Sequence, residues 1–394
     1  MEKFTFSIPQ DVIVEKGGLN RLPEAAEKLG GKKGFIISGP HLNKMGIVGK
    51  CMESLARTGI ESEAFTETEG NPSVETVEKA AERFRQSGAD FIVALGGGSP
   101  MDVAKAVGVV AKYGGSITEY EGGGKVPGDI IPLIAIPTTA GTGSEVTAFS
   151  VITDHSRDYK LTAFSYKLIP SIAILDAELL TTAPASVAAA CGVDAMIHAL
   201  EAYVSTAASP FSDAMAEKAL ELIGTYIRRY VANRGDMEAA EGMLTGSLFA
   251  GIAFSWARLG NVHAMSHPVS AFFDVPHGVA NAVLLPEVVR YNALADSGKY
   301  RKIFGYLTGK EVPADRFVPE MLADEICKLN ASLGIPSGLA EAVNRTGKKG
   351  TVSVEEIEEK IPAMAADAMK SGNIAVNPRS SVQKDIEELY RKSM

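Results

Sequence analysis

The sequence predicts an α/β domain over residues 1–182, followed by an all-helical domain over residues 183–394. In the first part, short apolar runs rich in β-branched residues alternate with stretches of helical periodicity, which is typical of a parallel sheet. After Pro184, long segments rich in Ala, Leu, Met and Glu repeat their apolar residues at helical spacing. The segment TTAP at 181–184 contains a helix N-cap candidate followed by proline, which places the boundary near residue 182.

The individual elements follow from the same patterns. The expected apolar strands are 34–39, 61–66, 90–98 and 132–139. The expected helices are 43–58, 73–87 and 100–113, and in the second domain 185–205, 212–231 and 237–254. Because the strands are apolar almost throughout, we expect helices to cover both faces of the sheet.

Composition and charge narrow the classes of partner. The chain has 394 residues and a formal charge of −9, and a surface of this sign repels nucleic-acid phosphates and anionic lipid. We therefore expect neither nucleic acid nor membrane as a partner, and no apolar stretch approaches the roughly 18 residues of a membrane span. Cys51, Cys191 and Cys327 are odd in number and far apart, which favours reduced thiols. Because MEKFTFSIPQ lacks a secretory pattern, we expect a cytoplasmic protein.

Two glycine-rich segments follow apolar strands. The first, GGGSPMDVAKAVG at 96–108, opens a helix whose N-terminal N–H groups can hold a phosphate; a tight turn with a capped helix is the alternative. The second, IPTTAGTGSEVT at 136–147, can clasp a pyrophosphate or a ribose with its hydroxyls, or form a polar surface turn. Met101 breaks the ordinary Rossmann fingerprint, and Val126 after Gly124-Lys125 breaks the P-loop pattern. Since ligands bind beyond the carboxyl ends of parallel strands, the two loops together favour a nucleotide site of another design.

Histidines and an aspartate recur at helical spacing in the second domain. Asp194 and His198 are four residues apart on an expected helix, so their side chains project from the same face. His263 and His267 repeat this spacing on a second expected helix, and His277 follows ten residues after His267.

The pattern favours a metal site, although a single apolar-flanked histidine is more often a core residue. The expected ligands are Asp194, His198, His263 and His277. Imidazole and carboxylate suit Fe²⁺ or Zn²⁺, and this set leaves room for a substrate oxygen. Gly278 is expected to permit a sharp turn beside the last ligand. Phe149 and Phe254 are candidates for an apolar substrate pocket, with core packing as the alternative.

These segments resemble the iron-containing (group III) alcohol dehydrogenase family. GGGSPMDVAKAVG, PTTAGTGSEVT, GVDAMIHALEAYVS and HAMSHPVSAFFDVPHGVANAVLLP carry the resemblance, which extends to NPRSSVQKDIEELY near the C-terminus. It implies an α/β dinucleotide-binding domain, an all-helical metal- and substrate-binding domain as in dehydroquinate synthase, and an active-site cleft between them. It also implies a homodimer or larger homo-oligomer. The implied contacts of NAD or NADP are Asn71, Gly97, Gly98, Ser99, Asp102, Thr138, Thr139, Thr142 and Lys160.

One cofactor position departs from the family pattern. Many NAD-dependent members carry Asp just after the early strand, where its carboxylate would bond the ribose diol and repel a 2′-phosphate. This chain has Gly39 there, in IISGPH. We therefore expect that NADP is tolerated or preferred, with His41 or Lys44 as the residue that approaches a phosphate.

The resemblance implies a metal-dependent alcohol dehydrogenase that moves a hydride between a small primary alcohol, aldehyde or diol and NAD(P). The ion, Fe²⁺ or Zn²⁺, is expected to act as a Lewis acid on the substrate oxygen. His267 is expected to position substrate or relay a proton, with orientation of a ligand as the alternative. The competing interpretations are a glycerol-type dehydrogenase, a dehydroquinate synthase-like lyase, and a nucleotide- or metal-binding protein without activity.

Overall fold

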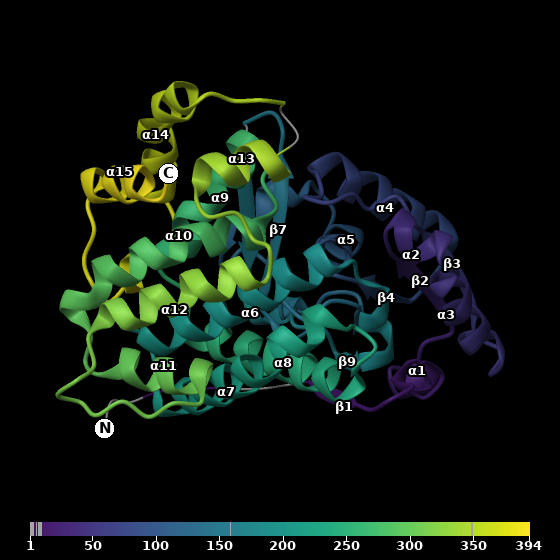
Figure 1. Cartoon of the computed structure of the whole chain (residues 1–394). Coiled ribbons are helices and arrows are strands. Elements are labelled where there is room, and N and C mark those ends of the chain that lie inside the picture. The colour runs from purple at the N-terminus through teal and green to yellow at the C-terminus, as the bar shows by residue number, and fades with distance from the viewer. Residues whose placement is uncertain (1–3, 5, 7–9, 158, 348–349) are drawn as a thin grey trace. The chain divides into compact units, whose positions relative to one another are not determined.

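The computed structural model describes residues 4, 6, 10–157, 159–347 and 350–394 (Figure 1). The chain divides into two compact units, one formed by Ser7–Thr182 and the other by Ala183–Met394 together with Met1–Phe6. In the second unit the ring of Phe6 stacks on that of Phe211, with centroids 3.9 Å apart.

A six-stranded sheet forms the centre of the Ser7–Thr182 unit, with the strand order β1-β9-β6-β4-β2-β3. All neighbouring strands are parallel, as the alternating pattern predicts. The strands are β1 (Asp11–Val14), β2 (Lys33–Ile37), β3 (Glu61–Phe65), β4 (Phe91–Gly96), β6 (Leu133–Pro137) and β9 (Ile172–Leu175).

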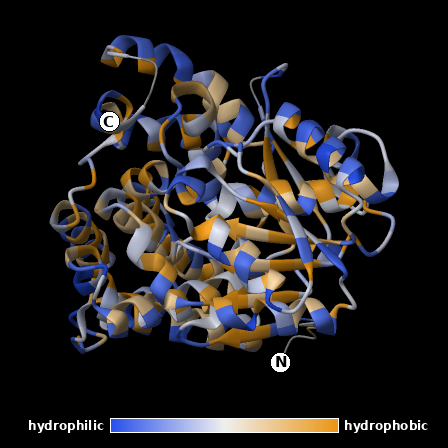
Figure 2. Cartoon of the chain, turned by 90° about the vertical axis from the view of Figure 1, so that its right-hand side faces the viewer, coloured by the Kyte–Doolittle hydropathy of each residue, from blue (hydrophilic) through white to orange (hydrophobic). Residues whose placement is uncertain are grey.

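Both faces of the sheet are buried, which confirms the expectation drawn from the apolar strands. Alternate residues of one strand enter different clusters: Phe35 packs in a cluster with residues of α4 and α5, whereas Ile36 packs in one with residues of α1 and α3. The strands are accordingly mostly hydrophobic in Figure 2. The helices of this unit are α1 (Leu22–Lys28), α2 (Pro40–Lys44), α3 (Ile47–Ala56), α4 (Val74–Ser87) and α5 (Gly98–Tyr113).

The helix expected over 43–58 is wrong as one continuous element. Gly46, with a φ of 77°, lies between α2 and α3 in the left-handed region, which a helix interior does not contain. A second, three-stranded sheet was also not predicted. It consists of β5 (Gly122–Gly123), β7 (Phe149–Asp154) and β8 (Tyr159–Phe164), with β7 and β8 antiparallel.

In the other unit, the described residues from Ala183 onward form helices and no strand. The helix N-cap expected from TTAP is wrong, since Pro184 precedes α6 and Thr182 instead bonds back to the carbonyl oxygen of Leu179. The helices are α6 (Ala185–Val204), α7 (Pro210–Ala232), α8 (Met237–Ala257), α9 (Asn261–Phe273), α10 (His277–Asn292), α11 (Lys299–Thr308), α12 (Pro319–Ser332), α13 (Leu339–Thr346), α14 (Val354–Ala368) and α15 (Gln383–Lys392).

Helix α6 corrects the expectation that no apolar stretch approaches the length of a membrane span. Among the described residues it is the one helix that is long and apolar enough by composition. However, 78% of its apolar window is buried within the structure, and it carries the buried polar residues Asp194, His198 and Glu201. These features are those of a core helix that bears functional groups.

Candidate active site

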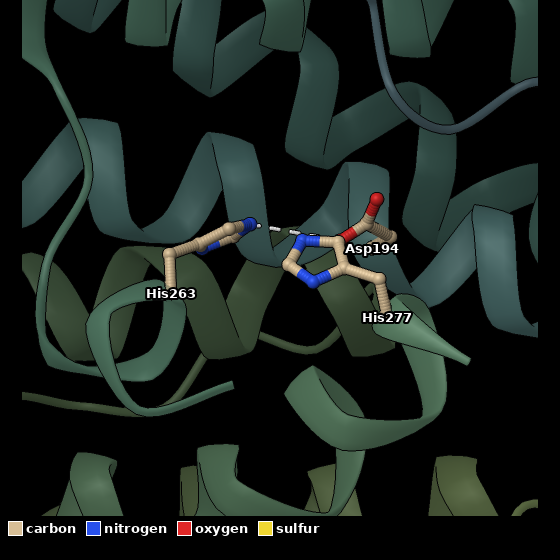
Figure 3. Close-up of side chains that lie close together, drawn as sticks. All are labelled: Asp194, His263 and His277. Atoms are coloured by element: carbon tan, nitrogen blue, oxygen red, sulfur yellow. Dashed lines mark ion pairs between the residues drawn. The ribbon is translucent and has the colours of Figure 1, made fainter. Parts of the chain in front are cut away.

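The predicted metal ligands come together from three helices of one unit. Asp194 and His198 lie on α6, His263 on α9, and His277 is the first residue of α10. Oδ1 of Asp194 is 3.9 Å from Nε2 of His198, 3.6 Å from Nε2 of His263 and 3.9 Å from Nε2 of His277. Figure 3 shows His263 and His277 directed toward this carboxylate. Ligand atoms of Asp194, His263 and His277 all lie within 4.8 Å of one another.

The chemistry and spacing of these donors fit a divalent ion. Ligands about 2.1 Å from a tetrahedral ion stand roughly 3.4 Å apart, close to the separations seen here. Burial alone would raise the pKa of Asp194. The neighbouring His198, His263 and His277 have a larger, opposite effect, so the pKa of Asp194 lies well below its usual range. Three imidazoles and one carboxylate suit first-row metals, and they would hold such an ion here.

An amide nitrogen lies against three of the predicted ligands. Nδ2 of Asn281, on α10, is 2.7 Å from Oδ1 of Asp194 and 3.1 Å from Nε2 of both His263 and His277. Asn281 is fully buried, and its Oδ1 has no hydrogen-bond partner among the described residues. The carboxylate oxygen of Asp194 accepts from this NH₂ group, and the two imidazole nitrogens lie on the same side of it, so the three ligand atoms face a common region.

Buried neighbours hold the imidazole rings in place. The ring of His198 stacks on Phe254 of α8, with centroids 4.5 Å apart, and on His263 at 4.6 Å. Phe254 thus packs on a predicted ligand, whereas Phe149 stacks on Phe164 in the other unit at 4.9 Å. Nδ1 of His263 is 2.6 Å from Oε2 of Glu201. Burial by itself lowers the pKa of His263, but its contacts with Asp194 and Glu201 raise it to about 9.

His267 lies beside the ligand set and outside the group that shares the carboxylate. It is one turn after His263 on α9, partly exposed, and its ring centroid is 5.2 Å from that of His277.

Gly278 does not make the sharp turn expected of it, because it is the second residue of α10. A Cβ there would lie 2.3 Å from the carbonyl oxygen of Ala190, so glycine permits close packing of α10 on α6.

Sequence reasoning missed two residues of this site, Glu201 and Asn281. Asn281 follows His277 by four residues, the same spacing that relates Asp194 to His198, but amides were not included among the expected ligand types. Glu201 follows Asp194 by seven residues, or two helical turns, and therefore lies on the same side of α6. This spacing was the available signal for Glu201.

In the α/β unit, the predicted nucleotide loops follow three neighbouring parallel strands. Gly39 follows β2, Gly97 follows β4 and Thr138 follows β6. Because β3 and β4 lie on opposite sides of β2, the strand order reverses between β2 and β4, where open α/β sheets bind ligands. The N–H of Thr138 donates to the carbonyl oxygen of Gly96 at 3.0 Å, which ties two of the loops together.

The glycines between the two loops are required by close packing. A Cβ at Gly97 would lie 3.1 Å from Oγ1 of Thr139, and one at Gly98 would lie 2.8 Å from Cγ2 of Thr142. Gly97 is the N-cap of α5 and has no side chain that could cap the N–H groups of the first turn, which includes Ser99. Uncapped N–H groups at a helix start suit an anionic ligand.

Asp102 is held by protein groups. Its carboxylate accepts hydrogen bonds from Oγ of Ser144 at 2.9 Å and from the N–H of Val151 at 3.2 Å. Nearby, the ammonium group of Lys105 donates to Oγ of Ser144 at 2.9 Å. It also donates to the carbonyl oxygens of Thr147 and Phe149. Burial raises the pKa of Asp102 and lowers that of Lys105 to about 8. Burial also raises the pKa of Glu145 to about 7.

Two further predicted cofactor residues contact each other across this unit. Nζ of Lys160, on β8, donates to Oδ1 of Asn71 at 2.8 Å. Asn71 has a φ of 57°, a left-handed conformation that asparagine adopts more readily than most residues. The structure thus places Lys160 beside a loop 89 residues away in the sequence.

Comparisons with known proteins agree with a metal-dependent oxidoreductase. The sequence model of the family described as iron-containing alcohol dehydrogenase matches residues 9–177. The sequence model of the C-terminal region of the Fe-containing alcohol dehydrogenase family matches residues 188–394. The chain is 34% identical to an NAD-dependent methanol dehydrogenase of Bacillus methanolicus, covering 99% of both. It is 35% identical to an NADPH-dependent butanol dehydrogenase of Clostridium saccharobutylicum, covering 98% of this chain and 96% of that one. A crystal structure of 1,3-propanediol oxidoreductase superposes with a TM-score of 0.92 at 36% identity, covering 100% of both chains.

The chain belongs to the iron-containing alcohol dehydrogenase family. The predicted fold class and the predicted activity are confirmed: the protein is an NAD(P)-dependent alcohol dehydrogenase that acts on small alcohols and aldehydes. The family match favours this activity over the lyase and the non-enzymatic binding protein.

Proposed function

We propose that the protein interconverts small primary alcohols or diols and their aldehydes at a single divalent ion held by Asp194, His198, His263 and His277. The observation that carries this proposal is that three histidines from three helices lie within 3.9 Å of one carboxylate oxygen of Asp194. Ligand atoms of Asp194, His263 and His277 also lie within 4.8 Å of one another. Relatives named for methanol, butanol and 1,3-propanediol support a small substrate that carries a primary hydroxyl. Fe²⁺ is the proposed ion because of the family, and Zn²⁺ suits the same donors.

The reaction removes a hydride from the carbinol carbon and a proton from the hydroxyl, and yields the aldehyde and NAD(P)H. A bound divalent ion supplies a Lewis acid toward the substrate oxygen, and the bound nucleotide supplies the hydride acceptor. His267 is proposed to move the hydroxyl proton, since its ring lies near that of His277 and the residue is partly exposed. The alternative role is to orient His277.

The proposed nucleotide contacts all lie in the α/β unit. They are Gly39, Asn71, Gly97, Gly98, Ser99, Asp102, Thr138, Thr139, Thr142 and Lys160. NADP is proposed to be accepted because Gly39, at the N-cap of α2, offers no carboxylate that would repel a 2′-phosphate. One relative is named for NADPH and another for NAD, so both uses occur among similar proteins.

The cellular compartment and the oligomeric state of the enzyme are also proposed. Cys51, Cys191 and Cys327 form no disulfide, which supports a reducing compartment such as the cytoplasm. A homodimer or larger homo-oligomer is proposed, and β1 offers an exposed sheet edge with Val14 52% exposed. Light scattering on purified protein measures the oligomeric state.

The deciding experiment combines metal content by mass spectrometry with formation of NAD(P)H from a panel of small alcohols. Wild type, reconstituted with Fe²⁺ or Zn²⁺, should hold one ion per chain and reduce the nucleotide. His277→Ala should lose both the ion and the activity. A reconstituted wild type that holds its ion but reduces neither nucleotide with any alcohol contradicts the proposed substrates.

A further inference from the structure

Glu201 is a buried carboxylate on α6 with both oxygens engaged on α9. Its Oε1 accepts the N–H of Val262 at 2.7 Å, and its Oε2 is 2.6 Å from Nδ1 of His263. The residue is 3% exposed, and a buried charge needs strong donors of this kind. Glu201 is outside the proposed ligand set and the nucleotide loops, so neither of these explains its two contacts with α9.

The bond to Val262 fixes the start of α9. This helix begins at Asn261 after Gly260, which offers no side-chain cap. Val262 is its second residue, and the N–H at that position normally bonds a capping side chain. A Cβ at Gly260 would lie 2.9 Å from Oε1 of Glu201, so glycine leaves the carboxylate room to reach the helix. Glu201 therefore caps α9 from α6 and sets the position of His263, the next residue.

The bond to His263 has a consequence for the other nitrogen of the ring. A carboxylate only accepts hydrogen bonds, so Nδ1 of His263 must carry a proton to bond Oε2. The opposite nitrogen, Nε2, is 3.6 Å from Oδ1 of Asp194. Carboxylates that bond a metal-binding histidine in this way fix its tautomer and ring orientation.

We propose that Glu201 is a positioning residue that holds His263 as the Nδ1–H tautomer and leaves Nε2 as the metal-binding nitrogen. The inference rests on the metal centre of the proposed function. The proposal predicts a specific effect of an isosteric substitution, because the N–H of Val262 and the Nδ1–H of His263 need two acceptor oxygens. Glu201→Gln supplies one oxygen and one NH₂ group. If the oxygen bonds Val262, the NH₂ group faces Nδ1 of His263, and the proton moves to Nε2, which then cannot bind a metal.

The test uses the protein loaded with Zn²⁺, a diamagnetic probe, and labelled with ¹⁵N-histidine. The chain has six histidines, so the imidazole signals can be assigned by substitution. In wild type, His263 should show a far-downfield proton on Nδ1, bonded to the carboxylate, and an Nε2 shifted by the metal. If Nδ1 of His263 carries no proton in the Zn²⁺-loaded wild type, the inference is overturned without recourse to any variant.

Chelator competition gives a second readout. Glu201→Gln should weaken Zn²⁺ binding about 10- to 100-fold, the range found when such outer partners of a ligand are changed. Its NADPH affinity, measured by fluorescence, should stay within about twofold of wild type, because the proposed nucleotide contacts lie in the other unit. A folded Glu201→Gln protein that binds Zn²⁺ as tightly as wild type overturns the inference alone. A wild type that binds no Zn²⁺ overturns the proposed centre as well.

Glu217→Gln is the matched control. Glu217 lies on α7 of the same unit and bonds the hydroxyl of Tyr203 and the ammonium group of Lys302, so the change removes a partly buried carboxylate away from the ligands. This variant should keep the Nδ1 proton of His263 and the wild-type Zn²⁺ affinity. An equal loss of affinity in both variants would indicate a general packing effect and would overturn a specific role for Glu201.

Discussion

The amide nitrogen of Asn281 lies 2.7 Å from Oδ1 of Asp194, the carboxylate that all three predicted histidine ligands approach. The two residues belong to α10 and α6, and 87 positions separate them in the sequence. Asn281 is thus a neutral donor that orients Asp194, the one carboxylate of the predicted ligand set. Its substitution should therefore separate the effects of charge and orientation on metal binding.

We predict opposite effects for two substitutions of Asn281. Asn281→Ala removes the donor to Asp194 and should weaken Zn²⁺ binding about tenfold or more. Asn281→Asp adds a buried carboxylate beside that of Asp194, which should lower the melting temperature without metal through like-charge repulsion and enlarge the increase produced by Zn²⁺. Melting curves with and without Zn²⁺ measure both. Identical metal-induced shifts in wild type and both variants would contradict this role of Asn281.

His267→Ala should reduce turnover while leaving the metal in place. If His267 moves the hydroxyl proton, kcat should fall on the order of 100-fold, the lower end of the usual effect of a general acid or base. Metal content and the pH dependence of kcat/KM should be measured together. Loss of the ion from this variant would instead support a role in orienting His277.

Gly278→Ala should disturb the helical unit. The added Cβ would lie 2.3 Å from the carbonyl oxygen of Ala190, so α10 must move away from α6, at a cost of about 1–3 kcal/mol or more. Because His277 precedes this residue, Zn²⁺ binding should weaken too. Gly305→Ala, on α11, is the control, since its nearest contact would be an ordinary 3.6 Å. Comparable stability of the two variants in urea unfolding would refute the packing argument.

Gly39→Asp should move cofactor preference toward NAD. A Cβ at this position would lie 3.2 Å from the carbonyl oxygen of Thr68, a tight contact that a small shift relieves. The carboxylate should lower kcat/KM with NADP relative to NAD by about tenfold or more, equivalent to about 1.4 kcal/mol. Asn43→Asp, which adds the same charge at an exposed position of α2, controls for net charge. A strong preference of the wild type for NAD would remove the basis of this prediction.

Glu145 should make the stability of the metal-free protein depend on pH. Burial raises its pKa from 4.5 to about 7, so between these values the folded state binds more protons than the unfolded chain. Stability should therefore fall as the pH rises from about 4.5 to about 7. Glu145→Gln should flatten this part of the curve of melting temperature against pH. Glu82→Gln, at an exposed position of α4, should leave the slope unchanged, and an equal flattening there would argue against Glu145 as the cause.

Several features of the fold followed from local patterns. Apolar strands such as FIVAL, directly before a glycine-rich turn and a helix, predicted parallel strands with ligand loops at their carboxyl ends, because side-chain periodicity and turn chemistry act over a few residues. The four-residue spacing of Asp194 and His198 likewise placed both on one helical face. The break at Gly46 was missed, since an isolated glycine can lie within a helix or end it.

The sequence by itself determined the succession of elements, the types of donor available and their spacing along each helix. Only the tertiary structure decided which helices share a site. Glu201 meets Val262 and His263 across 61 and 62 positions, and Asn281 meets Asp194 across 87. Such contacts depend on how α6, α9 and α10 pack, which is set by close approaches such as Gly278 on Ala190. Local periodicity states which face of a helix is apolar, but it carries no information on the partner that the face will meet.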